Sequence, residues 1–559
     1  MTDHWTIVYN EDNDLLSHLQ NSEDAAATLR SFLTWTVKRL RIDIWELLSA
    51  TPDICHYESK VGEVRGRRLM PQIVSHMTDG GGQEQRRRGK VPRHDWHKAY
   101  GLELLRLQGH DPLTIHIEVL RPLGIKVLAE MRMSDTHHRT ADPEQPLVSQ
   151  FLLDHPEYVI KRSDGMPETA LDYSHPEVRE HRLGILRELA ETYEIDGLSL
   201  NFMRWAKHFE RDCGREKAPI MTEFVGRVRR ILDETATRRG GGRLLLGARV
   251  LSSIDECLGA GLDVGAWIGR GYMDYVIPSE HNCSWPGLAV EPFAALAAGT
   301  GCRVYGHIND MIGGTWDGKP HIEDRGIAQA PYWRGYKGML NTEEEARATA
   351  CNLQSWGAEG LGFWNLPNNF NPICSQKWGQ DPRHRERMGR WARAVSDPGS
   401  ILAGPRRYHY LPLYKRDITQ SSGATHLYEE SGRSLHGAFK GAVLYFHEGR
   451  RGDRQEFPFR MADGRRGEKL SGLFRFRVFH CGDKDALEVD INSVPVAPEN
   501  VSRVADTHDP DLPWTWFAIA LADCPPFRGD NELGLTWQGR VDHGLQVPYM
   551  EELDILVQP

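Results

Sequence analysis

Residues 174–205 read "SHPEVREHRLGILRELAETYEIDGLSLNFMRW", and this stretch decides the fold because it holds one complete helix followed by one strand. The first part predicts an amphipathic helix: Ser174 and Glu177 match a capping box, and apolar residues then recur at helical spacing on one face. The second part, 196–202, is a short apolar run with a polar and aromatic exit. A helix that leads directly into a strand is the unit from which parallel sheets are built.

The same unit recurs along the first 395 residues or so. Further short β-rich runs lie at 41–47, 126–135, 243–250, 273–279, 302–309 and 359–366. We expect an eighth strand in the poorly patterned region 58–78, where "PQIVSHM" (71–77) is the best candidate. Seven or eight such units predict an α/β fold of the (β/α)8 TIM-barrel type, and no G-x-G-x-x-G follows the first strand to favour a dinucleotide-binding sheet.

The texture of the sequence changes near residue 400. Helical periodicity gives way to short alternating runs, such as Leu473, Arg475 and Arg477 interleaved with Phe474 and Phe476. This period of two is typical of half-buried strands. We therefore predict a barrel domain at 1–398 and an antiparallel β-sandwich domain at 399–559.

The bulk composition is that of a soluble enzyme, with 40% hydrophobic and 26% charged residues. The formal net charge of -10 argues against a nucleic-acid partner. No apolar run is long enough to span a membrane, and no signal-peptide pattern opens the chain. Nine cysteines without a C-x-x-C pair favour reduced thiols, so we expect a cytoplasmic protein.

The predicted strand exits are rich in carboxylate, amide, imidazole, guanidinium and indole groups. Catalytic groups of TIM barrels lie at these exits and in the loops beyond them. Sugars need such partners, because indole faces pack against their C–H faces and polar side chains bind their hydroxyl groups. We therefore expect a carbohydrate substrate. The candidate binding residues are His56, Glu130, Arg132, His137, Asn201, Arg204, Trp205, His281, Trp285, His307, Trp364 and Asn365.

Residues 170–205 resemble the central block of family-10-like glycosyl hydrolases, bacterial (β/α)8 proteins with a strand of the form D-G-L-x-L-D-F-x-R. "EMRMSDTHH" (130–138) is similar to their strand-three exit, and "YNEDND" (9–14) and "CHYESKVGE" (55–63) resemble their first strand and loop. The resemblance covers about 10–380. It implies glycoside hydrolysis, in which two carboxyl groups flank the scissile bond.

This chain departs from that motif at Asn201, which stands where the family has an aspartate and cannot exchange a proton near neutral pH. The acids must then come from other strand exits. Glu280 is the first candidate for the general acid or base, Asp310 the second catalytic candidate and Asp135 the third. Arg204 would suit an anionic sugar or would hold one of these acids in place.

Two other functions remain open. Asp135, His137 and His138 cluster, and His281 and His307 follow other strands, which would suit a metal-dependent lyase or isomerase acting on sugars or sugar acids. No spaced ligand signature supports a metal, so we expect neither a metal nor another cofactor. The missing acid at 201 would also fit a barrel that binds carbohydrate without catalysis. Formation of a homo-oligomer is left open.

Overall fold

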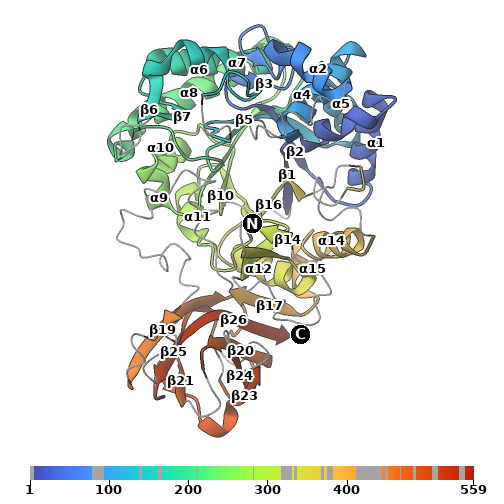
Figure 1. Cartoon of the computed structure of the whole chain (residues 1–559). Helices are drawn as coiled ribbons and strands as arrows, with labels where there is room; N and C mark the ends of the chain where they lie inside the picture. Colours follow the sequence, from blue (N-terminus) through green and yellow to red (C-terminus); the bar gives the residue numbers. More distant parts are fainter. Residues whose placement is uncertain are drawn as a thin grey trace.

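A computed structural model gives the architecture of the chain (Figure 1). It describes residues 5–78, 93–137, 141–161, 167–210, 212–280, 283–315, 330–332, 336–366, 371–373, 382–410, 444–446, 451–465, 468–481, 486–506, 514–524, 526–539 and 548–559. A ring of strands wrapped by helices forms the larger part, and a β-rich part lies against one side of it.

Eight strand positions form a parallel barrel within these described residues. The hydrogen-bonded order is β11-β10-β9-β8-β5-β2-β1-β16-β12, in which β11 and β12 are two pieces of one strand interrupted at Tyr305. Tyr305 N donates to Val276 O (3.0 Å) on one side and Glu359 N donates to Val304 O (2.8 Å) on the other, so the broken strand closes the ring. The predicted TIM barrel is confirmed. Its strands are β1 Thr6–Glu11, β2 Ile44–Ala50, β5 Lys126–Arg132, β8 Gly197–Asn201, β9 Leu245–Leu251, β10 Tyr275–Ser279, β11 Arg303–Val304, β12 Gly306–Ile308 and β16 Gly360–Trp364.

The prediction of a strand at 71–77 is wrong. These residues lie in the helix α2 (Met70–Thr78). Ile73 and Met77 follow one another at helical spacing and pack with Trp96 of the next helix. A short apolar run does not distinguish a strand from a buried helical turn, and here the period of four decides. The missing eighth strand is β1, the run "TIVYNE" near the start of the chain.

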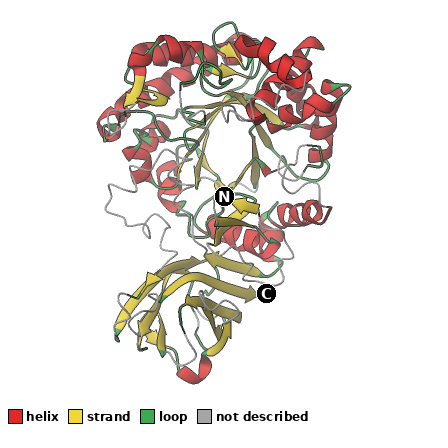
Figure 2. Ribbon diagram, viewed as in Figure 1, coloured by secondary structure: helices red, strands yellow, loops and turns green. Residues whose placement is uncertain are grey.

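Helices cover the outside of the barrel (Figure 2). No helix in the described ranges combines the length and the apolar character that a membrane crossing requires. The main helices are α1 Ala25–Val37, α2, α4 Arg93–Leu107, α5 Pro112–Leu120, α6 Gln150–Asp154, α7 Pro176–Thr192, α8 Gly214–Arg239, α9 Ile254–Gly259, α10 Val264–Gly269, α11 Glu291–Ala297, α12 Glu343–Ser355, α14 Pro382–Ala394 and α15 Pro398–Leu402.

The helix predicted from the opening stretch is α7, and its apolar stripe is buried as expected. The capping box predicted for Ser174 and Glu177 is wrong, because His175 occupies the N-cap position and makes no capping hydrogen bond with its side chain. Ser174 N instead donates to Asp172 Oδ1 (2.7 Å). This aspartate turn stands in place of the capping box, and the helix begins one residue later than predicted.

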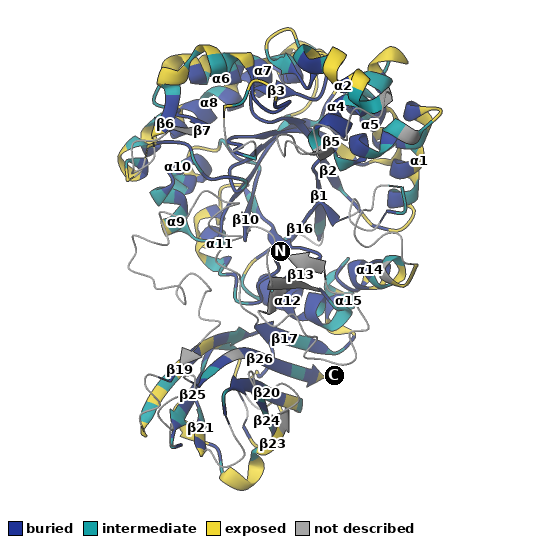
Figure 3. Cartoon of the chain, in the orientation of Figure 1, coloured by how far each residue is buried: buried dark blue, intermediate teal, exposed yellow. Residues whose placement is uncertain are grey.

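The barrel interior is apolar at its floor and polar above it. Side chains that face inward alternate along each strand, and Val8, Ile44, Leu128, Tyr275, Ile277 and Tyr305 form one buried cluster. Two positions further along the same strands lie Asn10, Glu46, Glu130, Ser279 and His307, all of them buried. The strands of the ring are accordingly dark in a view coloured by burial (Figure 3). Buried polar groups usually have hydrogen-bond partners, and Asn10, Glu46, Glu130 and Ser279 of this upper layer each have one.

Three aspartates, Asp43, Asp196 and Asp274, precede the strands β2, β8 and β10 at the opposite end of the barrel. Their Oδ2 atoms accept hydrogen bonds from the backbone N–H groups of Ile7 (2.8 Å), Val127 (2.9 Å) and Leu246 (2.8 Å) in the preceding strands. The backbone of each aspartate also bonds to the strands on both sides. These side chains therefore fix the alignment of neighbouring strands and take no part in the strand exits.

The C-terminal part consists of two antiparallel sheets, in agreement with the predicted change of texture. One has the order β17-β26-β20-β24-β23 with β18 beside β26, and the other has the order β19-β25-β21-β22. Phe459 of one sheet meets Phe474 of the other edge to face, with ring centroids 5.6 Å apart. The boundary at 398/399 stays a prediction. The strands are β17 Arg406–Tyr410, β18 Leu444–Tyr445, β19 Asp453–Met461, β20 Ser471–Phe479, β21 Leu487–Ile491, β22 Val494–Pro495, β23 Ser502–Asp506, β24 Trp514–Ala520, β25 Gly529–Trp537 and β26 Tyr549–Gln558.

The junction between the two parts is built on α12 and β17, which lie next to each other in Figure 1. His409 of β17 is buried between two buried glutamates. Its Nδ1 lies 2.7 Å from Glu345 Oε1 on α12, and its Nε2 lies 2.5 Å from Glu552 Oε1 on β26. An imidazole that faces a carboxylate at each nitrogen donates two N–H groups and carries a positive charge. Burial would lower the pKa of His409, but Glu552 and Glu345 outweigh it and raise the pKa above its ordinary value.

Candidate active site

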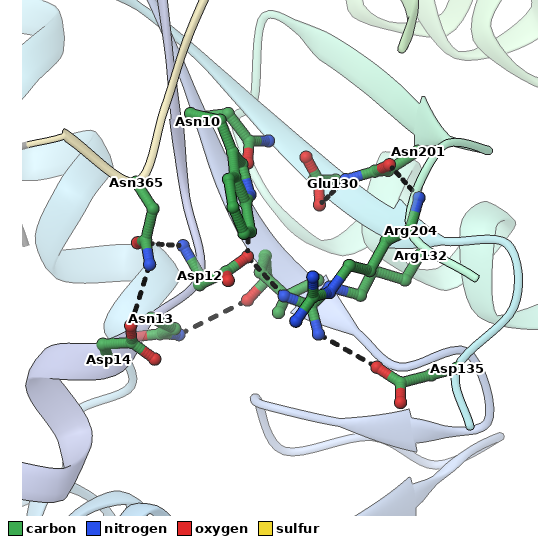
Figure 4. Close-up of polar contacts among 12 residues, drawn as sticks. Asn10, Asp12, Asn13, Asp14, Glu130, Arg132, Asp135, Asn201, Arg204 and Asn365 are labelled. Atoms are coloured by element: carbon green, nitrogen blue, oxygen red, sulfur yellow. Dashed lines mark hydrogen bonds and ion pairs between the residues drawn. The ribbon is translucent and has the colours of Figure 1, made fainter. Parts of the chain in front are cut away.

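Arg132 connects two strand exits at the upper face of the barrel (Figure 4). Its Nη1 donates to Asp135 Oδ2 (2.9 Å), and its Nη2 forms an ion pair with Asp12, which follows β1. Burial alone would raise the pKa of Asp12, but Arg132 outweighs it and holds the pKa below its ordinary value. The pKa of Asp135 lies well below its ordinary range, because His137 and Arg132 outweigh burial there too. Both aspartates are therefore carboxylate anions at neutral pH.

Glu130 is the opposite case. Asn201 Nδ2 donates to its Oε1 (3.2 Å), while Oε2 has no hydrogen-bond partner among the described residues. Burial raises the pKa of Glu130 well above its ordinary value, and the neighbouring carboxylates Glu46 and Asp12 raise it further. The pKa of Glu130 is therefore shifted toward the protonated form, in the opposite direction to that of Asp12 beside it.

His137 joins the exits of β5 and β8. Its Nδ1 lies 2.6 Å from Asp135 Oδ1, and its Nε2 lies 2.7 Å from Arg204 Nη2. Because a guanidinium only donates, Nε2 accepts from Arg204, while Nδ1 faces both the Asp135 carboxylate and the N–H donor of Trp205 Nε1, at 3.0 Å. The indole of Trp205 stands edge to face with this ring, at a centroid distance of 5.0 Å. Burial lowers the pKa of His137, in keeping with a neutral imidazole.

Trp364, the last residue of β16, is surrounded by charged groups. The guanidinium carbons of Arg204 and Arg249 lie 5.1 and 5.0 Å from the centroid of its ring, and its Nε1 donates to Asp12 Oδ1 (3.3 Å). Burial lowers the pKa of Arg249 to about 9. A positively charged group beside an indole face is a cation–π contact, which fixes the orientation of the ring.

Two strand exits adopt a backbone conformation that ordinary side chains rarely take. Trp205 has φ of 58° and Asn365 has φ of 54°. Asn365 Nδ2 donates to Asp14 Oδ2 (2.9 Å), and Asp12 N donates to Asn365 Oδ1 (3.3 Å), so this residue ties the exit of β16 to that of β1. Such left-handed backbone persists where the surroundings hold it, and it occurs often at functional sites.

The remaining predicted residues lie around this network or outside it. Glu280 directly follows β10, and Asp310 lies two residues after β12; both are buried, and their catalytic roles stay predictions. His307 is buried, and both of its ring nitrogens lack a partner within the described part of the chain. Trp285 packs edge to face on Tyr410 of β17, at 5.2 Å, and does not join the network.

His56 and His281 complete the predicted set. His56 Nδ1 donates to Leu48 O (3.2 Å), and its Nε2 lies 2.9 Å from Arg65 Nη1. Burial and Arg65 lower the pKa of His56 well below its ordinary value, so it is a neutral side chain of the scaffold next to the network. His281 and His138 lie outside the described residues.

Sequence reasoning missed several members of the network. Asp12 and Asp14 lie in "YNEDND", a run that was connected with the first strand only through a resemblance. Glu46 accepts a hydrogen bond from Tyr275 OH at 2.5 Å, and its pKa is raised by burial. Alternation along β1 and β9 was the available signal, because it places Asp12 and Arg249 on the inward face.

The described residues contain no group of three or more His, Cys, Asp or Glu side chains arranged to hold a metal ion. The cluster of Asp135 and His137 considered for a metal is instead joined by Arg132 and Arg204. A guanidinium beside each of these two groups takes the place that a cation would need.

No family model and no curated protein matches the chain. Solved structures of glycoside hydrolases resemble it at low similarity. The PgaB (BpsB) glycoside hydrolase domain from Bordetella bronchiseptica is 11% identical over 67% of this chain and 99% of that one, with a TM-score of 0.37. The maltogenic alpha-amylase AmyB from Thermotoga neapolitana is 10% identical over 72% and 79%, with a TM-score of 0.35.

A family 18 N-acetylglucosaminidase from Paenibacillus barengoltzii is 11% identical over 69% of this chain and 99% of that one, with a TM-score of 0.33. Values this low carry no argument about substrate or reaction, and the barrel assignment rests on the strand order described above. The resemblance of 170–205 to family-10-like glycosyl hydrolases stays a prediction.

Proposed function

We propose that the chain is a glycoside hydrolase that cleaves an oligosaccharide or glycoside at the exits of the barrel strands. The observation that carries this proposal is the contrast between Glu130 and Asp12. Both face the upper layer and both interact with Arg132, yet the pKa of Glu130 is raised and that of Asp12 is lowered. Glycoside hydrolysis requires one protonated and one ionised carboxyl group.

The proposed roles follow from these opposite pKa shifts. Glu130 donates its proton to the leaving glycosidic oxygen, and its Oε2, which has no partner among the described residues, is the oxygen available for that transfer. Asp12 acts as the ionised carboxylate on the other side of the bond. Arg132 keeps Asp12 anionic, and Asn201 orients Glu130 through its amide. Asn201 thus assists an acid on the neighbouring strand in place of supplying one.

The test compares two pairs of acids on a panel of aryl glycosides and oligosaccharides. E130Q is expected to lose about 10²–10⁴-fold in kcat on substrates with poor leaving groups, because the general acid is gone. On dinitrophenyl glycosides, whose leaving group needs no proton, the same variant keeps most of its rate. D12N is expected to lose activity on both kinds of substrate.

E280Q and D310N serve as the matched controls, since they remove the pair predicted from the sequence alone. If those variants lose turnover while E130Q and D12N stay near the wild type, the proposed roles are wrong and Glu280 and Asp310 take them over. A wild-type protein that binds sugars tightly but forms no product would support the alternative of a binding barrel.

A further inference from the structure

A cavity of about 430 Å³ lies at the junction between the barrel and the C-terminal domain. One wall is the end of α12, with Gln354 and Ser355, and another is Leu402 at the end of α15. Because α12 leads into the start of β16, this wall lies toward the foot of the barrel, away from the strand exits. The cavity is thus separate from the candidate active site and independent of the proposed function.

The inner wall of the cavity is a closed ion pair. Arg406 donates from Nε to Asp463 Oδ2 and from Nη2 to Asp463 Oδ1, both at 2.8 Å. Tyr408 OH donates to Asp463 Oδ2 at 2.7 Å. All three side chains are buried, and the two charges cancel. This pair gives the cavity a rigid wall that has no need of a ligand.

Two further arginines at the rim of the cavity have no such partner. Arg465 and Arg528 are exposed, and neither forms an ion pair with a carboxylate in the described part of the chain; Arg528 Nη2 donates to the backbone carbonyl of Ser355 at 3.4 Å. The nearby Glu468 is occupied, since its Oε2 accepts from the backbone N–H of Gly464 (2.9 Å) and of Arg465 (2.8 Å). Arg528 N donates to Gly464 O (2.9 Å), and this hydrogen bond joins the loop that carries Arg465 to the loop that carries Arg528.

A backbone hydrogen bond therefore connects the segment that carries Arg465 to the segment that carries Arg528. At Gly464 a side chain would meet Pro526 O at 2.7 Å, and φ is +88°, so only glycine allows this close approach. The lining of the cavity therefore carries three arginines against two carboxylates, with the surplus charge on the two rim side chains.

We propose that this cavity binds a small hydroxylated molecule that carries one phosphate or carboxylate group, such as a sugar phosphate or a sugar acid. The guanidinium groups of Arg465 and Arg528 bind the oxyanion, for which their planar geometry is suited. Gln354 and Ser355 face the hydroxyl groups. The volume lies within the range of roughly 300–1,000 Å³ that small-molecule sites occupy.

The experiment is a calorimetric titration of the full chain, at low ionic strength, with glucose 6-phosphate, glucuronate, inorganic phosphate and glucose. We expect one of the two anionic sugars to bind, and the double variant R465Q/R528Q to bind it about tenfold more weakly or worse, since charge-assisted hydrogen bonds are lost. R270Q, which removes another exposed arginine outside the cavity, is expected to bind like the wild type.

The titrations distinguish a phosphate ligand from a carboxylate ligand. Preference for glucose 6-phosphate assigns a phosphate ligand, and preference for glucuronate assigns a sugar acid. The proposal is overturned if no anionic sugar binds at millimolar concentration, if neutral glucose or inorganic phosphate binds equally well, or if the double variant binds undiminished. The single variant R528Q repeats the measurement should the double variant melt earlier than the wild type. Activity at the barrel exits has no part in the readout.

Discussion

Replacing His409 by leucine removes the only imidazole between Glu345 and Glu552 in the described structure. The three side chains are 0–1% exposed, so the substitution leaves two buried carboxylates facing each other across the junction. Breaking a buried pair by removing one partner costs about 3–5 kcal/mol. For a unit of about 150 residues, this corresponds to a decrease of roughly 6–20 °C in Tm.

The loss also depends on pH in a defined direction. The pKa of His409 is raised in the folded chain, from an ordinary value of 6.5. Its contribution is therefore complete below that value and is lost as the pH rises through the folded pKa. Other charges around it stay paired: Arg477 forms an ion pair with Glu552 (3.3 Å), and Arg475 and Arg407 face Asp554.

Scanning calorimetry of the wild type and H409L from pH 6 to pH 9 measures both effects. The difference in Tm is expected to be largest at pH 6 and to shrink toward pH 9. H110L is the control, because His110 is only partly buried and lies outside the junction. A Tm of H409L within a degree or two of the wild type, or a difference that grows with pH, would refute the reasoning.

Three further outcomes are expected. The pH profile of kcat/KM should fall on its alkaline side at a pH above 4.5, as Glu130 loses its proton. On its acid side it should fall only below 3.8, where Asp12 gains a proton. An alkaline limb at or below 4.5 would contradict the raised pKa of Glu130. R132K should lower kcat/KM about tenfold or more and move the acid limb to higher pH, because one ammonium cannot bridge Asp12 and Asp135 as the guanidinium does. An acid limb at the wild-type pH would show that other groups hold Asp12 anionic. D196A should lower the free energy of unfolding by about 1–3 kcal/mol, since Val127 N loses its acceptor. Urea titration measures this change. An unchanged midpoint would show that Asp196 does not stabilise the alignment of the strands.

The barrel was predictable because its strands are apolar runs of the right length between helices with clear periodicity. The run at 71–77 is the exception, because it forms a helix. The run at 71–77 has the length of a strand, but its contacts with Trp96 follow a helical period that only the packed structure reveals. The strand β1 was overlooked because "TIVYNE" is short and half polar, and its polar residues face a buried network.

The strand exits were predictable as the place of the site, but the links between them were not. Arg132 pairs with Asp12 across 120 positions of sequence, and Asn365 bonds to Asp14 across 351. No pattern along the chain encodes such pairs, because they depend on which strands become neighbours. The raised pKa of Glu130 was also beyond sequence reasoning, since it results from burial and from nearby carboxylates on other strands.

The aspartates at the foot of the barrel have a consequence for how the chain tolerates change. Asp43, Asp196 and Asp274 connect the neighbouring barrel strands β1, β2, β5, β8, β9, β10 and β11 by bonds that lie at that end. The register of the strands is thus set independently of the loops at the other end. Loops there could be lengthened, shortened or exchanged for those of another barrel without a slip of the strands, which makes the chain a suitable scaffold for grafting new binding loops.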